Sequence, residues 1–125
     1  KGGRGLQSEL LCALRELRPP FALYEADLHQ LVGAFLAEKG FDAVHEKTIA
    51  RGCRIDFWVG GVGVEIKKGK PQPAVLLRQL ARYAESPMIS GLIVLSQRGV
   101  HVPAQVGGKP VDYLCLNSLW GVALP

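Results

Sequence analysis

Several features that define large classes of proteins are missing from this sequence. No hydrophobic run approaches the roughly 18 residues that a membrane-spanning helix needs, and no signal-peptide pattern opens the chain. Cysteine is scarce, and the three residues Cys12, Cys53 and Cys115 are scattered and share no metal-ligand spacing. We therefore expect reduced thiols in a cytoplasmic protein that has no membrane as a partner.

Two catalytic motifs are also absent. There is no Gly-x-x-x-x-Gly-Lys loop to hold phosphates and no Gly-x-Ser-x-Gly turn to present a nucleophilic serine. Methionine occurs once, at Met88, and the first residue is Lys1, so we expect the chain to be a piece of a longer protein. The sequence does contain 48% hydrophobic residues in a length of 125, which suits one globular domain, and a net charge of +4, which weakly favours polyanionic partners.

The hydrophobic pattern predicts an α/β domain with one mixed sheet and helices on its faces. Leucines at helical spacing, followed by Pro19-Pro20, indicate a first helix over residues 6–18. Gly40, followed by the apolar Phe41, is expected to end the second helix as a left-handed cap. The other helices are expected at 24–39 and 74–85, the strands at 41–49, 54–59, 62–68, 91–96 and 111–116, and a closing helix or coil at 118–124.

Residues 54–68, RIDFWVGGVGVEIKK, have the pattern of a β-hairpin whose two-residue turn is Gly60-Gly61. This register places Asp56 directly opposite Glu65. Alternation along the strands would send four apolar side chains to one face and four charged side chains to the other. The apolar set is Ile55, Phe57, Val64 and Ile66, and the charged set is Arg54, Asp56, Glu65 and Lys67.

Two carboxylates that face each other on neighbouring strands need a cation nearby. Their Cβ atoms would lie ~5 Å apart, and like charges at that distance destabilise a sheet and raise the pKa of one acid. Lys67 supplies one positive charge on the same face, and a divalent cation held by oxygen atoms would supply more. The alternative is a solvated face with a surface salt-bridge cluster, but Glu65 lies in an otherwise apolar strand, VGVEIK.

The order of these residues resembles that of a known family. Asp56, eight intervening residues and then Glu65-Ile66-Lys67 are similar to the D…(D/E)xK signature of the PD-(D/E)xK nuclease superfamily, with Ile55 in place of the family's proline. The resemblance implies an α/β fold with a restriction-endonuclease-like α-β-β-β-α-β core at residues 21–97 of a single domain, 1–125. Residues 1–20 would form an N-terminal helical extension, and residues 98–125 a C-terminal extension with one more strand.

The resemblance also implies a set of functional residues. Asp56 and Glu65, together with the backbone carbonyl of Ile66, would bind Mg²⁺, with Mn²⁺ as a substitute. A divalent cation lowers the pKa of a bound water and neutralises charge that builds on a phosphate. Lys67 would complete the catalytic set by orienting the attacking water or by stabilising the transition state.

A third acid is expected on the helix before the sheet, as such nucleases often have. At about 100° per residue, Glu25 falls between Val32 and Leu36 inside the apolar stripe of this helix, where a carboxylate is costly unless it is paired or bound to a metal. Glu25 is therefore our candidate for a further metal ligand, and a first-turn glutamate favoured by the helix dipole is the alternative. His29 lies at the border of the stripe and is an additional candidate, although histidines at such borders are commonly structural.

The helix after the hairpin carries Gln79 and Tyr83 four residues apart, on the edge of its apolar stripe. This pair resembles the Gln-x-x-x-Tyr motif of RecB-type members of the superfamily, where it borders the active site and helps to hold the nucleic-acid strand. Basic residues in the same region are expected to contact phosphates and to supply non-specific affinity. They are Lys68, Lys70, Arg78, Arg82 and Arg54.

We therefore predict a metal-dependent nuclease that hydrolyses phosphodiester bonds in DNA, in repair, recombination, restriction or the processing of phage or mobile-element DNA. The alternative is a module with the same fold that binds nucleic acid without cutting it, and an unrelated small α/β domain is the third interpretation. A homodimer would suit the cutting of two strands. No segment of the sequence is typical of a specificity domain, so target choice is expected to come from a fused domain or a partner.

Overall fold

The computed structural model describes residues 2–19 and 25–117, without the side chains of residues 2–4 and 25. The helices are α1 (Gly2–Leu14), α2 (Glu25–Glu38) and α3 (Pro73–Ala84). The strands are β1 (Val44–Ala50), β2 (Cys53–Val59), β3 (Val62–Lys67), β4 (Gly91–Ser96), β5 (Gln105–Val106) and β6 (Lys109–Cys115). Every helix and strand expected within these residues is confirmed, and the two-residue β5 is an addition. The closing helix or coil expected at 118–124 lies outside the described residues.

Two helix ends show how the sequence sets the boundaries. Gly40 has a φ of 88° and ends α2, as expected, and the N–H of Phe41 reaches back to the Leu36 carbonyl at 2.9 Å. By contrast, α1 ends at Leu14, earlier than expected, because the chain continues in tighter turns in which the Leu17 N–H donates to the Leu14 carbonyl at 3.0 Å. Leu17 is still buried, so the leucine spacing in the sequence predicts buried positions that continue past the end of the regular helix.

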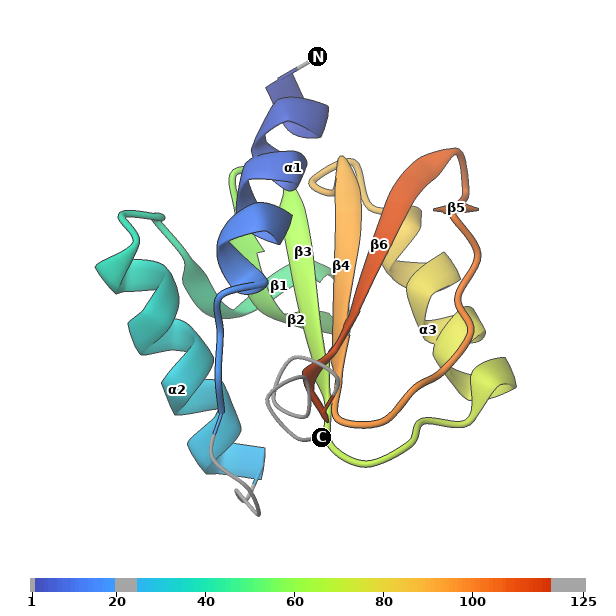
Figure 1. Cartoon of the computed structure of the whole chain (residues 1–125). Coiled ribbons are helices and arrows are strands. Elements are labelled where there is room, and N and C mark those ends of the chain that lie inside the picture. The colour runs from blue at the N-terminus through green and yellow to red at the C-terminus, as the bar shows by residue number, and fades with distance from the viewer. Residues whose placement is uncertain (1, 20–24, 118–125) are drawn as a thin grey trace.

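The six strands form one mixed sheet in the order β1-β2-β3-β4-β6-β5. The neighbours β1, β2 and β3 are antiparallel, and β3, β4 and β6 run parallel to one another. All six residues of β4 are buried, in agreement with the expectation of a strand covered on both faces. The helices α1 and α2 cover one face of the sheet and α3 covers the other, so the chain is an α/β domain with three flanking helices (Figure 1).

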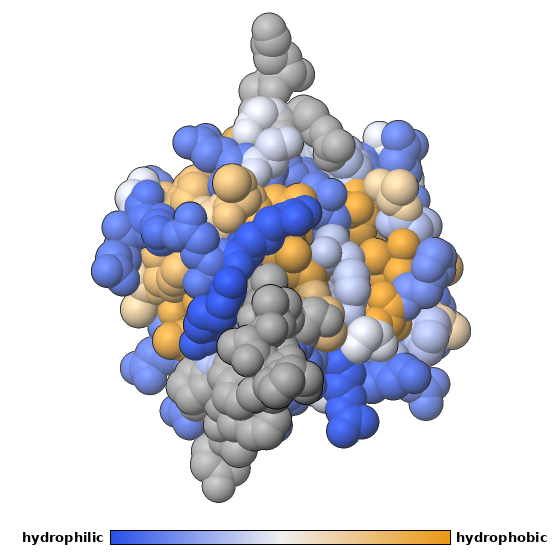
Figure 2. Space-filling view, in the orientation of Figure 1, coloured by the Kyte–Doolittle hydropathy of each residue, from blue (hydrophilic) through white to orange (hydrophobic). Residues whose placement is uncertain are grey.

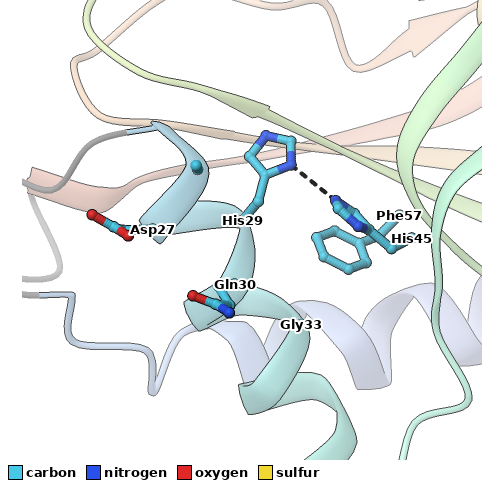
Figure 3. A pocket seen from close by; sticks show the side chains of 7 residues that line it. Asp27, His29, Gln30, Gly33, His45 and Phe57 are labelled. Carbon is cyan, nitrogen blue, oxygen red and sulfur yellow. Dashed lines mark hydrogen bonds between the residues drawn. The ribbon is translucent and has the colours of Figure 1, made fainter.

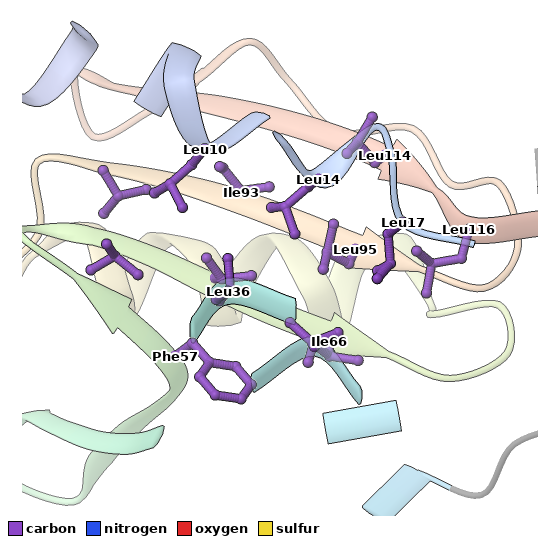
Figure 4. Packing of buried hydrophobic residues seen from close by; sticks show 14 of the residues in the cluster. Leu10, Leu14, Leu17, Leu36, Phe57, Ile66, Ile93, Leu95, Leu114 and Leu116 are labelled. Carbon is purple, nitrogen blue, oxygen red and sulfur yellow. The ribbon is translucent and has the colours of Figure 1, made fainter. Parts of the chain in front are cut away.

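Each face of the sheet has its own hydrophobic core. The first core lies under α1 and α2, where Leu10 and Leu14 lie over Ile93 and Leu95 of β4 and Leu36 lies over β3 (Figure 4). The second core lies under α3 and contains Leu76, Leu80, Leu92 and Val94 among others. Because burying one leucine contributes about 1.5–3 kcal/mol, both cores contribute to the stability of the strands between them.

The outer surface is mixed in character. Figure 2 shows hydrophilic side chains over most of the rim of the face that carries α1, with hydrophobic side chains visible between them. No helix in the described part of the chain is long and apolar enough to cross a membrane. The cysteines Cys12, Cys53 and Cys115 are free thiols, as expected from their scattered positions.

Candidate functional site

The hairpin between β2 and β3 has the register that its two glycines predict. Gly60 and Gly61 both have positive φ, 55° and 103°, which a two-residue turn of this kind requires and which glycine adopts at low cost. Val59 pairs with Val62, and Phe57 pairs with Val64. The turn therefore fixes which residues of the two strands meet further along the hairpin.

Beyond Phe57 and Val64 the two strands separate. The paired part of the ladder ends there, and the N–H of Ile66 donates to the Oδ2 atom of Asp56 at 2.8 Å. In a regular continuation of this register, Ile66 would pair with the backbone of Ile55. The carboxylate of Asp56 thus takes the place of a backbone carbonyl as the acceptor, which holds Asp56 in the gap between β2 and β3.

One expectation from alternation is wrong at this point. Ile55 was expected on the same face as Phe57, but it packs in the core under α3, whereas Phe57 packs in the core under α1 and α2. The physical reason is a local distortion of the strands. Glu46, which lies across from Asp56 on β1, has a φ of 54°, and β2 leaves β3 at Asp56. Strict alternation holds only where the ladder is regular.

The backbone carbonyl of Ile66 is directed toward the same gap. In a β-strand the N–H and C=O of one residue point to the same neighbouring strand, and the Ile66 N–H points to Asp56. The next residue faces the other way, because the Lys67 carbonyl accepts a hydrogen bond from Gln97 N–H at 2.9 Å. The Ile66 carbonyl, expected as a metal ligand, therefore lies on the side of Asp56.

Glu65 is buried, with only 4% of its surface exposed, and three residues position it. The hydroxyl of Tyr83 on α3 donates to its Oε1 atom at 3.0 Å, and the Gln79 amide donates to the Tyr83 hydroxyl at 2.9 Å. The amine of Lys67 lies 3.3 Å from the Oε2 atom of Glu65. The Gln-x-x-x-Tyr pair of α3 and the Glu-x-Lys of β3 thus form one connected hydrogen-bond network.

Burial shapes the electrostatics of the two acids. Burial, with the nearby charge of Asp56, raises the pKa of Glu65 to about 7, although Lys67 and Tyr83 act in the opposite direction. Burial also raises the pKa of Asp56, against the lowering effects of the Ile66 N–H, His29 and Lys67. Burial and Glu65 together raise the pKa of Tyr83, so its hydroxyl stays protonated and remains a donor. The two acids therefore lie close enough to influence each other's pKa, although the paired ladder ends before the predicted Asp56–Glu65 pair.

Two histidines extend the site toward α2 and β1. The Nε2 atom of His29 lies 3.8 Å from the Oδ2 atom of Asp56, and its Nδ1 atom lies 3.2 Å from the Nε2 atom of His45. The ring of His45 stacks on that of Phe57, with the centroids 4.7 Å apart. Sequence reasoning identified His29 but missed His45. The signal that could have found His45 is the β1–β2 pairing, in which His45 is the partner of Phe57, next to Asp56.

The basic residues that were predicted to bind nucleic acid differ in their exposure and contacts. Lys68, Lys70 and Arg78 are exposed. Arg82 donates to the Gly52 carbonyl at 3.1 Å and so ties α3 to the turn between β1 and β2. Arg54 lies 3.9 Å from Glu46 on the exposed side of β1 and β2, measured between its Nη1 atom and the carboxylate.

The metal ligands expected from the sequence are hard oxygen donors. Asp56, Glu65 and the Ile66 carbonyl surround the gap between β2 and β3, and such donors suit Mg²⁺. The described side chains include no cluster of three or more His, Cys, Asp or Glu that could hold a metal. Glu25, the expected further ligand, is the first residue of α2, but its side chain lies outside the described part of the chain. The residues present fit a hard cation through two carboxylates and one carbonyl.

A pocket of about 470 Å³ lies between α2 and the rings of His45 and Phe57 (Figure 3). Its walls are the first half of α2 and the stacked rings of His45 and Phe57, and His29 lies between the pocket and Asp56. The α2 residues that line it are Ala26, Asp27, His29, Gln30 and Gly33.

Comparison with known proteins gives no family for this chain. No family model, no curated protein and no solved structure matches it.

Proposed function

We propose that this chain is a metal-dependent nuclease with a restriction-endonuclease-like core, and that it hydrolyses phosphodiester bonds in DNA. The observation that carries the proposal is the environment of Glu65. This acid is only 4% exposed, lies beside Asp56 and contacts Lys67, at the point where β2 and β3 separate. A solvated salt-bridge cluster on a hairpin would leave both acids in water. There, their charges would lower the stability of the fold only slightly, and they would need no shared cation.

The cost of this arrangement argues for a ligand. Glu65 is buried and Asp56 is partly buried, and burial raises the pKa of both acids, that of Glu65 to about 7. The protein itself therefore does not fully compensate their charge. Perturbed acids of this kind cluster at functional sites. When bound, Mg²⁺ would compensate the two charges, neutralise charge on a phosphate and make a water more acidic.

The chain's own residues have distinct roles in this proposal. Asp56 and Glu65 hold the cation, with the Ile66 carbonyl as a further donor. Tyr83 and Gln79 fix the orientation of Glu65 through its Oε1 atom, which leaves the Oε2 side to Lys67 and the ligand. The Lys67 amine then stabilises negative charge on the phosphate as the bond to the leaving oxygen lengthens, or orients the attacking water.

Incubation with DNA tests the proposal directly. Linear, circular and branched DNA would be incubated with the protein in EDTA, in Mg²⁺ and in Mn²⁺. We expect cleavage only with the metals, and its loss in the variants Asp56→Asn and Glu65→Gln. Asp42→Asn and Glu85→Gln remove exposed acids of the same types and should leave cleavage unchanged.

Two outcomes would overturn the proposal. Undiminished cleavage by the purified Asp56→Asn or Glu65→Gln variants would contradict the assigned site. Metal-independent binding of DNA without any cleavage would favour the alternative, a nucleic-acid-binding module that uses exposed basic residues such as Lys68, Lys70 and Arg78.

A further inference from the structure

We propose that the pocket between α2 and the stacked rings of His45 and Phe57 holds an unpaired nucleobase of the strand that is cut. This inference rests on the proposed function and names its substrate class, DNA with single-stranded character at the cleavage point. The pocket volume of about 470 Å³ lies within the range of ordinary ligand sites and accommodates one base with its sugar.

The rings that line one side of the pocket have the chemistry that binds a base by stacking. His45 stacks on Phe57 with an interplanar angle of 28°, and His29 approaches His45 edge to face at a centroid distance of 5.4 Å. Aromatic rings and histidines are the usual platforms for bases that have left a duplex. Every base has a π-face, so such a platform tolerates any sequence.

The helix side of the pocket provides space and polar groups. At Gly33, a Cβ atom would lie 3.2 Å from two atoms of the Phe57 ring, so the absence of a side chain there keeps the wall open beside the ring. Asp27 and Gln30, both exposed on α2, provide a carboxylate and an amide next to the pocket. These groups can accept from and donate to the Watson–Crick edge of a base, which is accessible only when the base is unpaired.

The position of the pocket links it to the acids. His29 lines the pocket, and its Nε2 atom lies 3.8 Å from the Oδ2 atom of Asp56. A base in the pocket would therefore bring a phosphate of its own strand close to Asp56 and Glu65. A base that is still paired within a duplex cannot enter the pocket, because it remains stacked between its neighbours.

A binding experiment without metal isolates the contribution of the bases. Fluorescence anisotropy in EDTA would compare an oligothymidine strand with an abasic strand of the same length, since the two carry the same phosphates. We expect the protein to bind the strand with bases about tenfold more tightly, the size of effect that stacking of one base supplies. A duplex of the same length should bind more weakly than the single strand at equal salt concentration.

Three variants assign this preference to the pocket. His45→Ala should reduce the preference for bases to within about twofold, and His45→Phe should retain it, because the ring remains. The His45 side chain is 50% exposed, and His45→Phe keeps the ring that stacks on the core residue Phe57. His101→Ala removes an exposed histidine elsewhere and is the matched control. An unchanged preference in His45→Ala overturns the pocket assignment, as does equal loss in His45→Phe and His45→Ala.

The experiment separates this inference from the proposed function. If His45→Ala loses the preference for bases but no metal supports cleavage, the pocket binds a base and the nuclease proposal fails. If the protein cleaves DNA in Mg²⁺ but His45→Ala binds both strands like the unmodified protein, the nuclease proposal holds and the pocket inference is wrong.

Discussion

At the scale of the residue, Lys67 and Lys68 are neighbours in sequence but differ in their contacts. The Lys67 amine lies 3.3 Å from a carboxylate oxygen of buried Glu65, and its side chain is 27% exposed. Lys68 follows the end of β3 and is exposed to solvent. The proposed roles follow from this difference, with Lys67 acting on the reacting phosphate and Lys68 on the backbone of the bound DNA.

The first prediction compares the two lysines. Lys67→Ala should slow single-turnover cleavage by about two orders of magnitude under saturating DNA, since one contact made in the transition state typically supplies ~3 kcal/mol. Lys68→Ala should cleave at a nearly normal rate once DNA is saturating, while its affinity falls modestly and depends less steeply on salt. Equal single-turnover rates for the two variants would show that Lys67 is only a surface charge.

At the scale of the element, the hairpin shows what a sequence pattern can and cannot predict. The pair Gly60-Gly61 predicts the register from Val59 and Val62 to Phe57 and Val64, and the predicted pairing of Asp56 with Glu65 lies beyond the end of this ladder. The two acids are still near enough for the charge of Asp56 to raise the pKa of Glu65. The same reasoning misplaced Ile55, because it assumed an unbroken ladder. The ladder ends where the Asp56 carboxylate accepts a hydrogen bond from the Ile66 N–H. Hydrophobic periodicity cannot predict such an end, because the pattern of apolar residues is the same whether the acceptor is a side chain or a backbone carbonyl.

The helix α3 carries two arginines, Arg78 and Arg82, for which the sequence predicts the same role but which differ in their contacts in the structure. Arg82 donates to the Gly52 carbonyl at 3.1 Å and reaches the Arg51 carbonyl at 3.5 Å. It therefore joins α3 to the turn between β1 and β2. Arg78, one helical turn earlier, is exposed on the same helix. Spacing alone cannot distinguish them, because the partner of Arg82 comes from a turn about 30 residues away in sequence.

The second prediction follows from this contrast between Arg82 and Arg78. Arg82→Ala should lower the free energy of unfolding by about 1 kcal/mol, the usual contribution of an exposed hydrogen bond from a charged donor, as measured by urea denaturation in EDTA. Arg78→Ala should leave stability unchanged within error and weaken DNA binding in low salt. If Arg82→Ala is as stable as Arg78→Ala, the link to the β1–β2 turn contributes nothing measurable.

At the scale of the whole molecule, the candidate site is formed where helices from both faces of the sheet contact one hairpin. Tyr83 reaches Glu65 from the α3 side, and His29 reaches Asp56 from the α2 side. The sequence predicted the order of elements and the residues on the hairpin, since both depend on local periodicity and turn chemistry. It could not predict which helix side chains would contact which acid, because helix docking depends on the packing of both cores.

The raised pKa of Glu65 makes the stability of the whole domain depend on pH. The pKa of this acid rises from about 4.5 in the unfolded chain to about 7 in the folded one. Between these values the folded state holds a proton that the unfolded state has lost, so the free energy of unfolding falls as pH rises through this window. The loss reaches roughly 3 kcal/mol above pH 7, and the raised pKa of Asp56 adds to it in the same direction.

The last prediction uses this dependence to detect the metal without DNA. In EDTA, the stability advantage of Glu65→Gln over the unmodified protein should grow from pH 5 to pH 8, because the amide cannot ionise. Adding Mg²⁺ at pH 8 should raise the melting temperature of the unmodified protein and leave that of Glu65→Gln nearly unchanged, since the cation binds the ionised acid. The effect of Mg²⁺ should shrink toward pH 5, where a proton occupies Glu65. Thermal unfolding at both pH values checks each step, with Glu85→Gln as the exposed control. Parallel stability curves for the unmodified protein and Glu65→Gln would show that Glu65 carries no burial cost, and with it the argument for a cation at the β2–β3 gap would fail.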